Sequence, residues 1–326
     1  MHNNKDYSTT KAISNSSLGL LQDSPKAFIK FFNQELEEKE ESYFKQGSAI
    51  HCYILEPLVF AEDYVFQDYS MPNSPKKKAF IDLYLKSKGK EDEKLKKAYK
   101  SSYSTVLNDD IVLKKAKELK KELKPYLKML DLESKGKIVL PKKQEYHLRK
   151  IKDAVLKHPK ASELIFKVPE DFENVFAYNE TPVYWQVEIE GTTYDLKALI
   201  DRLVIDKDNK VIQIIDLKST RKIENFEESV TQFEYDRQLA FYSKAVVELF
   251  KQKFPDDNIE DYKVEHFIVA VNKEDEPECR VFKIKESRVL EAAHKIKELL
   301  ERAHWHFKNK KWDYSVEQYT QGYEEI

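Results

Sequence analysis

The segments YDLKALIDRLVI (residues 194–205), DKDNK (206–210) and VIQIIDLK (211–218) follow one another in the chain. The first and third are dominated by aliphatic residues, and the short segment between them is polar. Two apolar runs joined by a polar turn predict a β-hairpin. The predicted hairpin brings charged residues of both strands together inside an apolar sheet.

Two aspartates become neighbours when this hairpin closes. A turn centred on residues 208–209 places Leu203 opposite Ile214 and Asp201 opposite Asp216. Facing side chains have Cβ atoms about 4.5–5.5 Å apart, and like charges at that separation are destabilising unless a cation lies between them. The register therefore predicts a site that attracts a positive charge.

Lys218 lies two residues beyond Asp216, so both side chains point to the face of the hairpin that carries Asp201. We expect Leu199 on that face as well, and Ile200 on the opposite one. Strands that are apolar on both faces are buried strands covered by helices. The three charged residues are therefore expected to be buried.

Buried carboxylates are costly unless they are paired or bind a metal ion. A structural ion pair between aspartate and lysine is the alternative interpretation. An oxygen-rich site with a single lysine suits Mg²⁺ or Mn²⁺ rather than Zn²⁺, which prefers nitrogen and sulfur ligands. Magnesium held by two carboxylates is typical of phosphoryl chemistry, so we expect one or two such ions.

The composition excludes several classes of protein. The chain has 326 residues, with 56 Lys and Arg against 58 Asp and Glu, and 41% hydrophobic residues, which is typical of a globular protein. Its six glycines are too far apart for a dinucleotide-binding or Walker phosphate loop. Two cysteines, Cys52 and Cys279, cannot build a disulfide framework or a four-cysteine metal cluster. The first residues are polar, and no run of about 18 apolar residues occurs, so we expect a cytoplasmic protein without membrane association.

The chain has three regions that we expect to form one integrated domain. Residues 1–66 are predicted to be helical, with helices that begin near Ser14 and Ser24. Residues 67–165 form a helical elaboration, and residues 166–326 form the core. Within the core, the sequence predicts strands in 172–220, at 263–271 and at 279–284, and helices at 234–252 and around 289–307.

Lysines are concentrated in the second region. Residues 76–100 contain ten lysines against four acidic residues, and residues 114–128 contain seven lysines against two. Local basic clusters attract polyanions such as DNA even when the net charge of the chain is near zero. Solvated helix faces are the alternative interpretation.

Three short motifs resemble one nuclease superfamily. Asp201 followed by Asp216-Leu217-Lys218 resembles the D…(D/E)-x-K signature of the PD-(D/E)XK nucleases, although Ile200 stands where the proline of the name would be. The segment GSAIH (47–51) resembles the G-x-x-x-H motif of the RecB-like and phage exonuclease branch, and QLAFY (238–242) resembles its Q-x-x-x-Y motif. On a helix, the first and last residues of each motif lie on one face.

Further segments are similar to the exodeoxyribonuclease VIII-type, or RecE-like, nucleases of phages and prophages. They are ISNSS (13–17), DSP (23–25), LEP (55–57), HP (158–159) and YDRQ (235–238). The resemblance implies an α/β fold of the restriction-endonuclease type, with a mixed central sheet flanked by helices and a helical N-terminal elaboration. It also implies an exodeoxyribonuclease, dependent on Mg²⁺ or Mn²⁺, that degrades linear double-stranded DNA from free ends in the 5′ to 3′ direction.

The same resemblance implies partners. The enzyme would leave single strands for a separate annealing protein in phage-type recombination, and relatives form homo-oligomeric rings around DNA. It would act in the cytoplasm of a bacterial cell, encoded by a phage or prophage. Two other functions stay open: a structure-specific or site-specific endonuclease on the same fold, and a DNA-binding module without catalysis.

The resemblance also assigns roles to individual residues. Lys218 would orient the attacking water and offset charge, while Gln238 and Tyr242 would order the site. The residues expected to hold the metal are His51, Asp201, Asp216, the backbone carbonyl of Leu217 and Glu180. The residues expected to contact DNA phosphates are Ser219, Thr220, Arg221, Lys222 and Arg237.

Overall fold

The computed structural model describes residues 7–35, 42–167 and 173–325 of the chain. The chain forms two compact units, the first made of Met1–Pro57 together with Arg149–Ile326 and the second of Leu58–Leu148. These boundaries differ from those expected at residues 66 and 165, because lysine content does not follow the packing of the chain.

A five-stranded sheet forms the centre of the first unit, in the order β3-β4-β5-β6-β7. β4 is antiparallel to both β3 and β5, β6 runs parallel to β5, and β7 is antiparallel to β6. This mixed sheet, flanked by helices, confirms the predicted fold class. The strands are β3 (Val175–Ile189), β4 (Thr192–Asp206), β5 (Val211–Thr220), β6 (Lys263–Asn272) and β7 (Cys279–Ile284).

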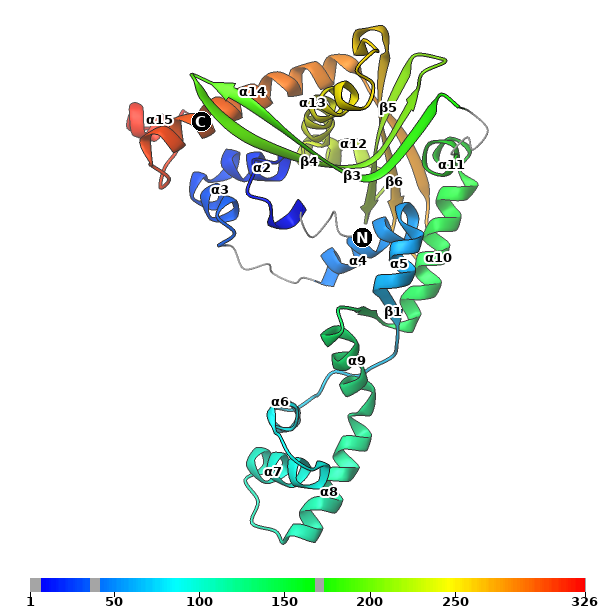
Figure 1. Cartoon of the computed structure of the whole chain (residues 1–326), viewed down its shortest axis with the longest axis vertical. Coiled ribbons are helices and arrows are strands. Elements are labelled where there is room, and N and C mark those ends of the chain that lie inside the picture. The colour runs from blue at the N-terminus through cyan, green and yellow to red at the C-terminus, as the bar shows by residue number, and fades with distance from the viewer. Residues whose placement is uncertain (1–6, 36–41, 168–172, 326) are drawn as a thin grey trace. The chain divides into compact units, whose positions relative to one another are not determined.

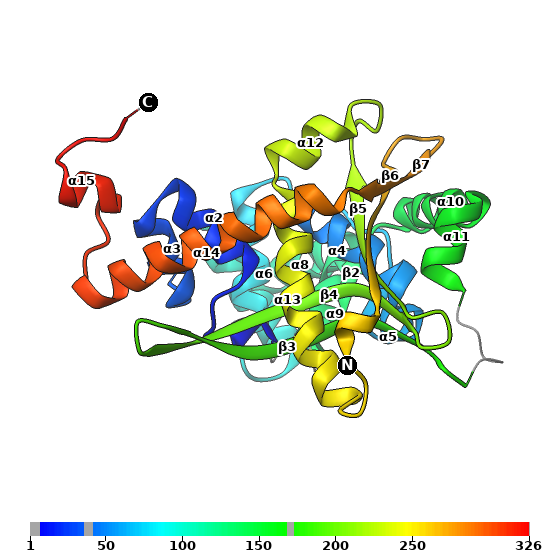
Figure 2. The ribbon, with the colours of Figure 1, turned by 90° about the horizontal axis from the view of Figure 1, so that it is seen from above.

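Helices cover both faces of this sheet (Figures 1 and 2). The long helix α13 (Tyr235–Lys253) connects β5 to β6 and packs on one face, and α4 (Ser42–Leu55) lies over the other. Parallel neighbouring strands require such a crossover. The other helices of this unit are α2 (Asn15–Asp23), α3 (Pro25–Phe32), α10 (Lys142–Lys157), which begins in the second unit, α11 (Pro159–Phe166), α12 (Phe226–Gln232), η1 (Ile259–Asp261), α14 (Glu286–Asn309) and α15 (Val316–Thr320).

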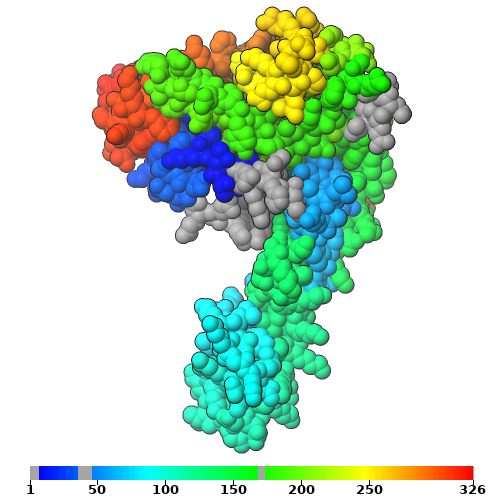
Figure 3. Space-filling view, viewed as in Figure 1, coloured from blue at the N-terminus to red at the C-terminus, as the bar shows by residue number. Residues whose placement is uncertain are grey.

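The N-terminal helices begin at the predicted residues. Ser14 caps α2 in a capping box, in which the Ser17 backbone N–H donates to Ser14 Oγ and the Ser14 N–H donates to Ser17 Oγ. Ser24 caps α3. In the space-filling view, the blue surface of these helices lies against the red C-terminal segment (Figure 3), where the rings of Phe28 and Trp312 stack with centroids 5.6 Å apart. The two segments therefore stabilise each other.

The register of the β4–β5 hairpin is the predicted one, since Leu203 pairs with Ile214. The predicted faces are wrong for Leu199 and Ile200, because Ile200 belongs to the same buried core cluster as Leu203 and Leu199 does not. The alternation of β4 changes at Asp201. There the facing residue of β3, Glu180, has a φ of 42°, in the left-handed region. A residue in this conformation interrupts the regular pleat.

The second unit has its own apolar core. Two short parallel strands, β1 (Tyr64–Phe66) and β2 (Ile138–Leu140), pair within it. Phe80, Leu95 and Leu119 are among the buried residues that its helices share. Those helices are α5 (Pro57–Asp63), α6 (Pro75–Lys86), α7 (Glu91–Tyr103), α8 (Asp109–Glu122) and α9 (Lys124–Ser134).

Acidic residues of the second unit neutralise part of its lysine content. Asp109 pairs with both Lys96 and Lys100, at 2.7 and 2.6 Å, and Glu91 pairs with Lys120 at 2.5 Å. Residues 58–148 still contain 21 Lys and Arg against 14 Asp and Glu, so the unit carries a net positive charge. In the described part of the chain, no helix is long and apolar enough to cross a membrane.

Candidate active site

The candidate site lies where β4 and β5 separate. The ladder between these strands ends at the pair Arg202–Ile215, one residue before Asp201 and Asp216. Asp201 Oδ2 accepts a hydrogen bond from the Leu217 N–H instead, at 2.9 Å. Because the N–H and C=O groups of one strand residue point to the same side, the Leu217 carbonyl also faces the space beside Asp201. Both aspartates are buried, as predicted.

A histidine and two carboxylates meet beside this opening. His51 Nδ1, from α4, lies 3.5 Å from Asp201 Oδ2 and 3.7 Å from Glu180 Oε1. One potential ligand atom from each of these residues lies within 4.8 Å of the other two. One imidazole nitrogen and two carboxylate oxygens are a donor set that fits a divalent cation. The left-handed backbone of Glu180, described above, occurs at this cluster, where strained conformations are often found.

Asp216 gives a second sign that a cation fits here. Its Oδ1 accepts a hydrogen bond from Lys218 Nζ at 2.7 Å. Its buried Oδ2, although 2.7 Å from the same ammonium group, accepts no hydrogen bond of acceptable geometry from any described residue. Buried polar atoms normally have a partner, so this oxygen has free coordinating capacity.

The Lys218 side chain is fixed by two neighbours. Besides its ion pair with Asp216, its Nζ lies 5.0 Å from the ring centroid of Tyr235, the first residue of α13. An ammonium group at this distance from an aromatic ring is attracted to its π face. Tyr235 was not predicted as a site residue.

Burial and charge oppose each other throughout the site. Burial raises the pKa of Asp216 to about 6, and it also raises the pKa of Asp201. For His51, burial disfavours the charged form, but Asp201 and Glu180 outweigh it and raise the pKa. Burial also disfavours the charged form of Lys218, but the charges of Asp216 and Asp201 outweigh the effect of burial and raise the Lys218 pKa. The Lys218 side chain is therefore an ammonium ion. The carboxylates therefore set the electrostatics of the site.

The two members of the Q-x-x-x-Y motif contact each other. Gln238 Nε2 donates a hydrogen bond to Tyr242 Oη at 2.7 Å, one turn further along α13. Burial and the charges of Asp201 and Asp216 hold the pKa of Tyr242 well above its usual value. The phenol therefore stays neutral and faces the acidic side of the site.

The expected DNA contact at Arg237 is wrong. Arg237 is buried, its Nε donates to Glu234 Oε2 at 2.9 Å, and its Nη1 donates to the backbone and side-chain oxygens of Asn15, both at 2.8 Å. Adjacent helix residues point in different directions, so Gln238 faces the site while Arg237 faces α2. Its guanidinium group ties α13 to the N-terminal helices.

The remaining predicted DNA contacts lie at the end of β5. Ser219 and Thr220 are half-buried and pair with β6, while Arg221 and Lys222 are exposed in the following loop. Neither Arg221 nor Lys222 forms an ion pair with a residue that the structure describes. These two side chains are therefore available to an external anion.

The contact between Lys197 and the N-terminal segment at Tyr7 is not predicted by the sequence. Buried Lys197 donates from Nζ to the carbonyls of Tyr7 and Thr10, at 2.7 and 2.6 Å, and burial lowers its pKa. Nearby, the Ile13 N–H donates to the Asp195 carbonyl, so the N-terminal segment occupies the edge of β4 that β5 has left. The only sign of this contact in the sequence is a lysine inside an apolar strand. A buried lysine is costly unless it has hydrogen-bond partners.

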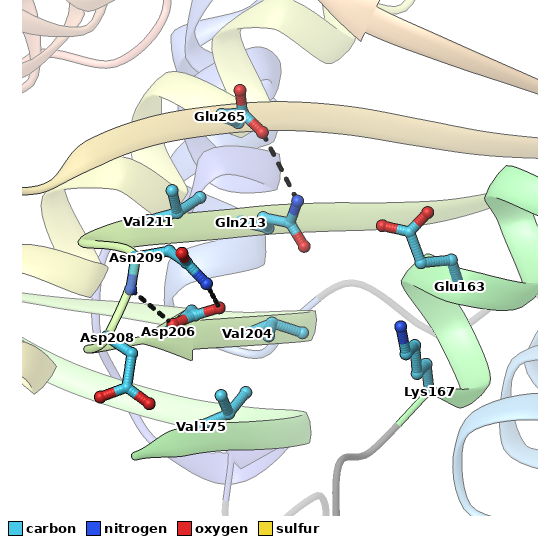
Figure 4. Close-up of a pocket in the computed structure, with 10 residues that line it drawn as sticks. All are labelled: Glu163, Lys167, Val175, Val204, Asp206, Asp208, Asn209, Val211, Gln213 and Glu265. Atoms are coloured by element: carbon cyan, nitrogen blue, oxygen red, sulfur yellow. Dashed lines mark hydrogen bonds between the residues drawn. The ribbon is translucent and has the colours of Figure 1, made fainter. Parts of the chain in front are cut away.

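A separate cavity of about 460 Å³ lies at the other end of the hairpin, around its turn. Figure 4 shows Asp206 accepting hydrogen bonds from Asn209, and Gln213 next to Glu265. No residue of the three motifs lines this cavity. The chemistry therefore lies outside it.

The fold and this arrangement of carboxylates and lysine define a PD-(D/E)XK nuclease-like protein. The chain belongs to the family described as a PDDEXK-like domain of unknown function (DUF3799), whose model matches residues 142–320, more than half of the chain. His51 precedes the matched residues, whereas Glu180 and the hairpin lie inside them. Family and site together support a hydrolytic nuclease.

Solved structures also match this chain. A protein from Eubacterium rectale described as a "Putative exonuclease" is 14% identical, with a TM-score of 0.48, and the match covers 97% of this chain and 89% of that chain. The protein SSO0001 is 15% identical, with a TM-score of 0.24, and the match covers 69% of this chain and 84% of that chain. Among curated proteins, none matches the chain.

Proposed function

We propose that this protein is an exodeoxyribonuclease, dependent on Mg²⁺ or Mn²⁺, that hydrolyses linear double-stranded DNA from its ends. One observation carries the proposal: the cluster of His51, Glu180 and Asp201 lies next to the buried ion pair of Asp216 and Lys218. A structural ion pair would need neither the histidine nor the third carboxylate. The direction of cleavage, 5′ to 3′, follows from the motif resemblance.

The residues of the site have different proposed roles. His51, Glu180 and Asp201, with Asp216 and the Leu217 carbonyl, would hold the cation. A bound divalent cation would polarise the scissile phosphate and lower the pKa of a water molecule. Lys218 donates hydrogen bonds from a charged group held in place by Asp216 and Tyr235, which suits it to orient water and to stabilise developing negative charge.

Two further pairs position the substrate. The hydrogen bond from Gln238 fixes the Tyr242 phenol beside the carboxylates. Exposed Arg221 and Lys222 lie three and four residues beyond Lys218, where they would bind phosphates next to the scissile one without reading sequence. Non-specific phosphate contacts of this kind suit an enzyme that moves along a strand.

The proposed biological role is the production of single strands in phage-type recombination. The partners would be duplex DNA with free ends and a separate single-strand annealing protein, and a homo-oligomeric ring would keep the enzyme on its substrate. A bacterial cytoplasm is the proposed location. These proposals come from the resemblance to RecE-like nucleases.

The first experiment compares linear and closed DNA. Duplexes labelled at the 5′ or the 3′ end, and a covalently closed circle, are incubated with the protein in Mg²⁺, in Mn²⁺ and in a chelator. We expect nucleotide release from linear DNA in either metal and none from the circle. Cutting of the circle would instead identify an endonuclease, and binding without release in any metal would identify a non-catalytic DNA-binding module.

Two lysines of the hairpin, one inside the site and one outside it, provide matched variants. Lys218→Ala removes the ammonium group of the site, and we expect activity to fall by about two to three orders of magnitude or more. Lys207→Ala is the control, because Lys207 also pairs with an aspartate, Asp257, at 2.7 Å, but lies near the turn of the hairpin and outside the candidate site. Equal activity of the two variants would contradict the assignment of Lys218.

A further inference from the structure

An exposed aromatic ring lies next to the candidate site. Phe233, between α12 and α13, is 57% exposed and stacks on Tyr235, with ring centroids 5.7 Å apart and an interplanar angle of 29°. Tyr235 in turn holds the ammonium group of Lys218 over its ring. Phe233 is therefore two side-chain contacts away from the proposed catalytic lysine, on the surface beside it.

The turn that presents this ring is held in an unfavourable backbone conformation. Glu234, between the two aromatic residues, has a φ of 51° and a ψ of 47°, in the left-handed region. Its carboxylate accepts a hydrogen bond from Arg237 Nε at 2.9 Å and pairs with Lys295, and Arg237 is itself bound to Asn15. Such strain persists only where the surroundings impose it. The position of Phe233 is thus set by the fold.

Aromatic packing supports the ring from below. Tyr235 stacks on Phe226, with centroids 5.9 Å apart, and Phe226 stacks on Phe282 of β7, with centroids 4.9 Å apart. Phe226 is fully buried. Contacts between neighbouring rings therefore link Phe233 at the surface to Phe282 in the sheet, and they support Phe233 in place.

Positive charge without a neutralising partner lies on the adjacent loop. Arg221 and Lys222 are exposed, and the Lys273 N–H donates to the Thr220 carbonyl at 3.1 Å. Burial and the neighbouring charge of Arg221 lower the pKa of Lys273. None of these three cations pairs with a carboxylate among the described residues. Figure 2 shows that this loop leads from the end of β5 directly to α12, which precedes Phe233.

We propose that Phe233 stacks on an unpaired nucleobase of the DNA strand whose phosphate occupies the candidate site, which rests on the function proposed above. Aromatic rings bind bases of any sequence, because every base has a π face, and nearby cations bind the phosphates of the same strand. A base inside a duplex is already stacked on its neighbours. The protein therefore prefers DNA with a short single-stranded or frayed end over a blunt duplex.

The experiment measures DNA binding in a chelator, where cleavage cannot interfere. The full-length chain, Phe233→Ala and Phe233→Trp are titrated against fluorescent duplexes with a short single-stranded end or a blunt end, and binding is followed by anisotropy. We expect Phe233→Ala to weaken binding to the single-stranded end by about 5-fold to 150-fold, and Phe233→Trp to restore it. Leu290→Ala is the control, because Leu290 is 58% exposed on α14, and it should bind as the wild type does.

Removing the base from the DNA tests the stacking itself. An abasic position is moved one nucleotide at a time along the single-stranded end. At one position the wild type should lose as much affinity as Phe233→Ala loses on intact DNA, while Phe233→Ala should bind intact and abasic DNA equally. Equal losses for both proteins at every position would overturn the inference.

Two further outcomes are informative. If Phe233→Ala changed the oligomeric state and left binding by the assembled protein unchanged, the ring would serve contact with a second copy of the chain, and the inference would be wrong. Nuclease activity of the same preparations separates the two proposals. If the wild type cleaves DNA and Phe233→Ala binds DNA as the wild type does, only the stacking role is wrong. If the wild type neither binds nor cleaves DNA, the proposed function is wrong.

Discussion

The substitution Asp216→Asn should make the protein more stable and inactive. Asp216 is 1% exposed, and burial raises its pKa from 3.8 to about 6 even with Lys218 beside it. A shift of this size corresponds to about 3 kcal/mol, at 1.36 kcal/mol per pKa unit. The folded protein therefore carries an ionised carboxylate that costs about this much free energy of unfolding at neutral pH.

The sign of the pH dependence follows from the raised pKa. Between pH 3.8 and about 6 the folded state holds the Asp216 proton more tightly than the unfolded state does, so the contribution of this group to stability decreases as pH rises. Its cost is fully present above pH 7 and absent below pH 3.8. Asparagine keeps an acceptor for Lys218 and carries no charge, so the gain from Asp216→Asn should approach 3 kcal/mol at pH 8 and vanish near pH 4.

Urea denaturation followed by tryptophan fluorescence measures this effect. All three tryptophans, Trp185, Trp305 and Trp312, belong to the first unit, so the signal reports the unfolding of the part that contains Asp216. A gain of about 3 kcal/mol would raise the urea midpoint by about 1 M or more at pH 8, given the usual dependence on denaturant. Loss of DNA cleavage in the same variant would accompany it.

One pattern would refute the reasoning. If Asp216→Asn were less stable than the wild type at pH 8, the ion pair with Lys218 would outweigh the cost of burying the carboxylate. Asp257→Asn serves as the control, because Asp257 pairs with Lys207 near the surface and is less buried. This control should show no gain in stability that grows with pH.

Two other substitutions have expected outcomes. Arg237→Met removes the buried hydrogen bonds to Asn15 and Glu234, so we expect a loss of about 3 kcal/mol in the free energy of unfolding. We also expect faster proteolysis near α2. Unchanged proteolysis would contradict the role of Arg237 as a clamp between α13 and Asn15. Tyr242→Phe deletes the acceptor of the Gln238 hydrogen bond and should cost about 1 kcal/mol in urea denaturation, with a lower cleavage rate; full activity would show that the phenol has no role in the site.

The elements that local signals define could be predicted from the sequence. The register of Leu203 and Ile214 follows from the length of a polar turn, and the helices that carry His51 and Gln238 follow from spacing. Capping by Ser14 needs only the neighbouring residues. These features depend on interactions within a few residues of the chain, which is the range in which patterns are informative.

Features that depend on distant contacts could not be predicted. The left-handed conformation of Glu180 occurs at a residue type with no preference for it, so the sequence gives no local signal of it. The position of Arg237 next to a motif suggests a DNA contact, yet the direction of its side chain on the helix depends on where α2 packs. The burial of Lys197 likewise depends on a segment near residue 10, which no local pattern connects to β4.

The clamp between Arg237 and Asn15 has a consequence for protein synthesis. Its two residues are 222 positions apart in sequence. The contact between His51 of α4 and Asp201 of β4 likewise joins segments that are synthesised before and after the entire second unit. Contacts of such sequence separation form late during folding. A nascent or truncated chain that ends before α13 has neither the clamp nor the Gln238–Tyr242 pair. Premature termination therefore yields fragments that lack part of the site proposed to cleave DNA.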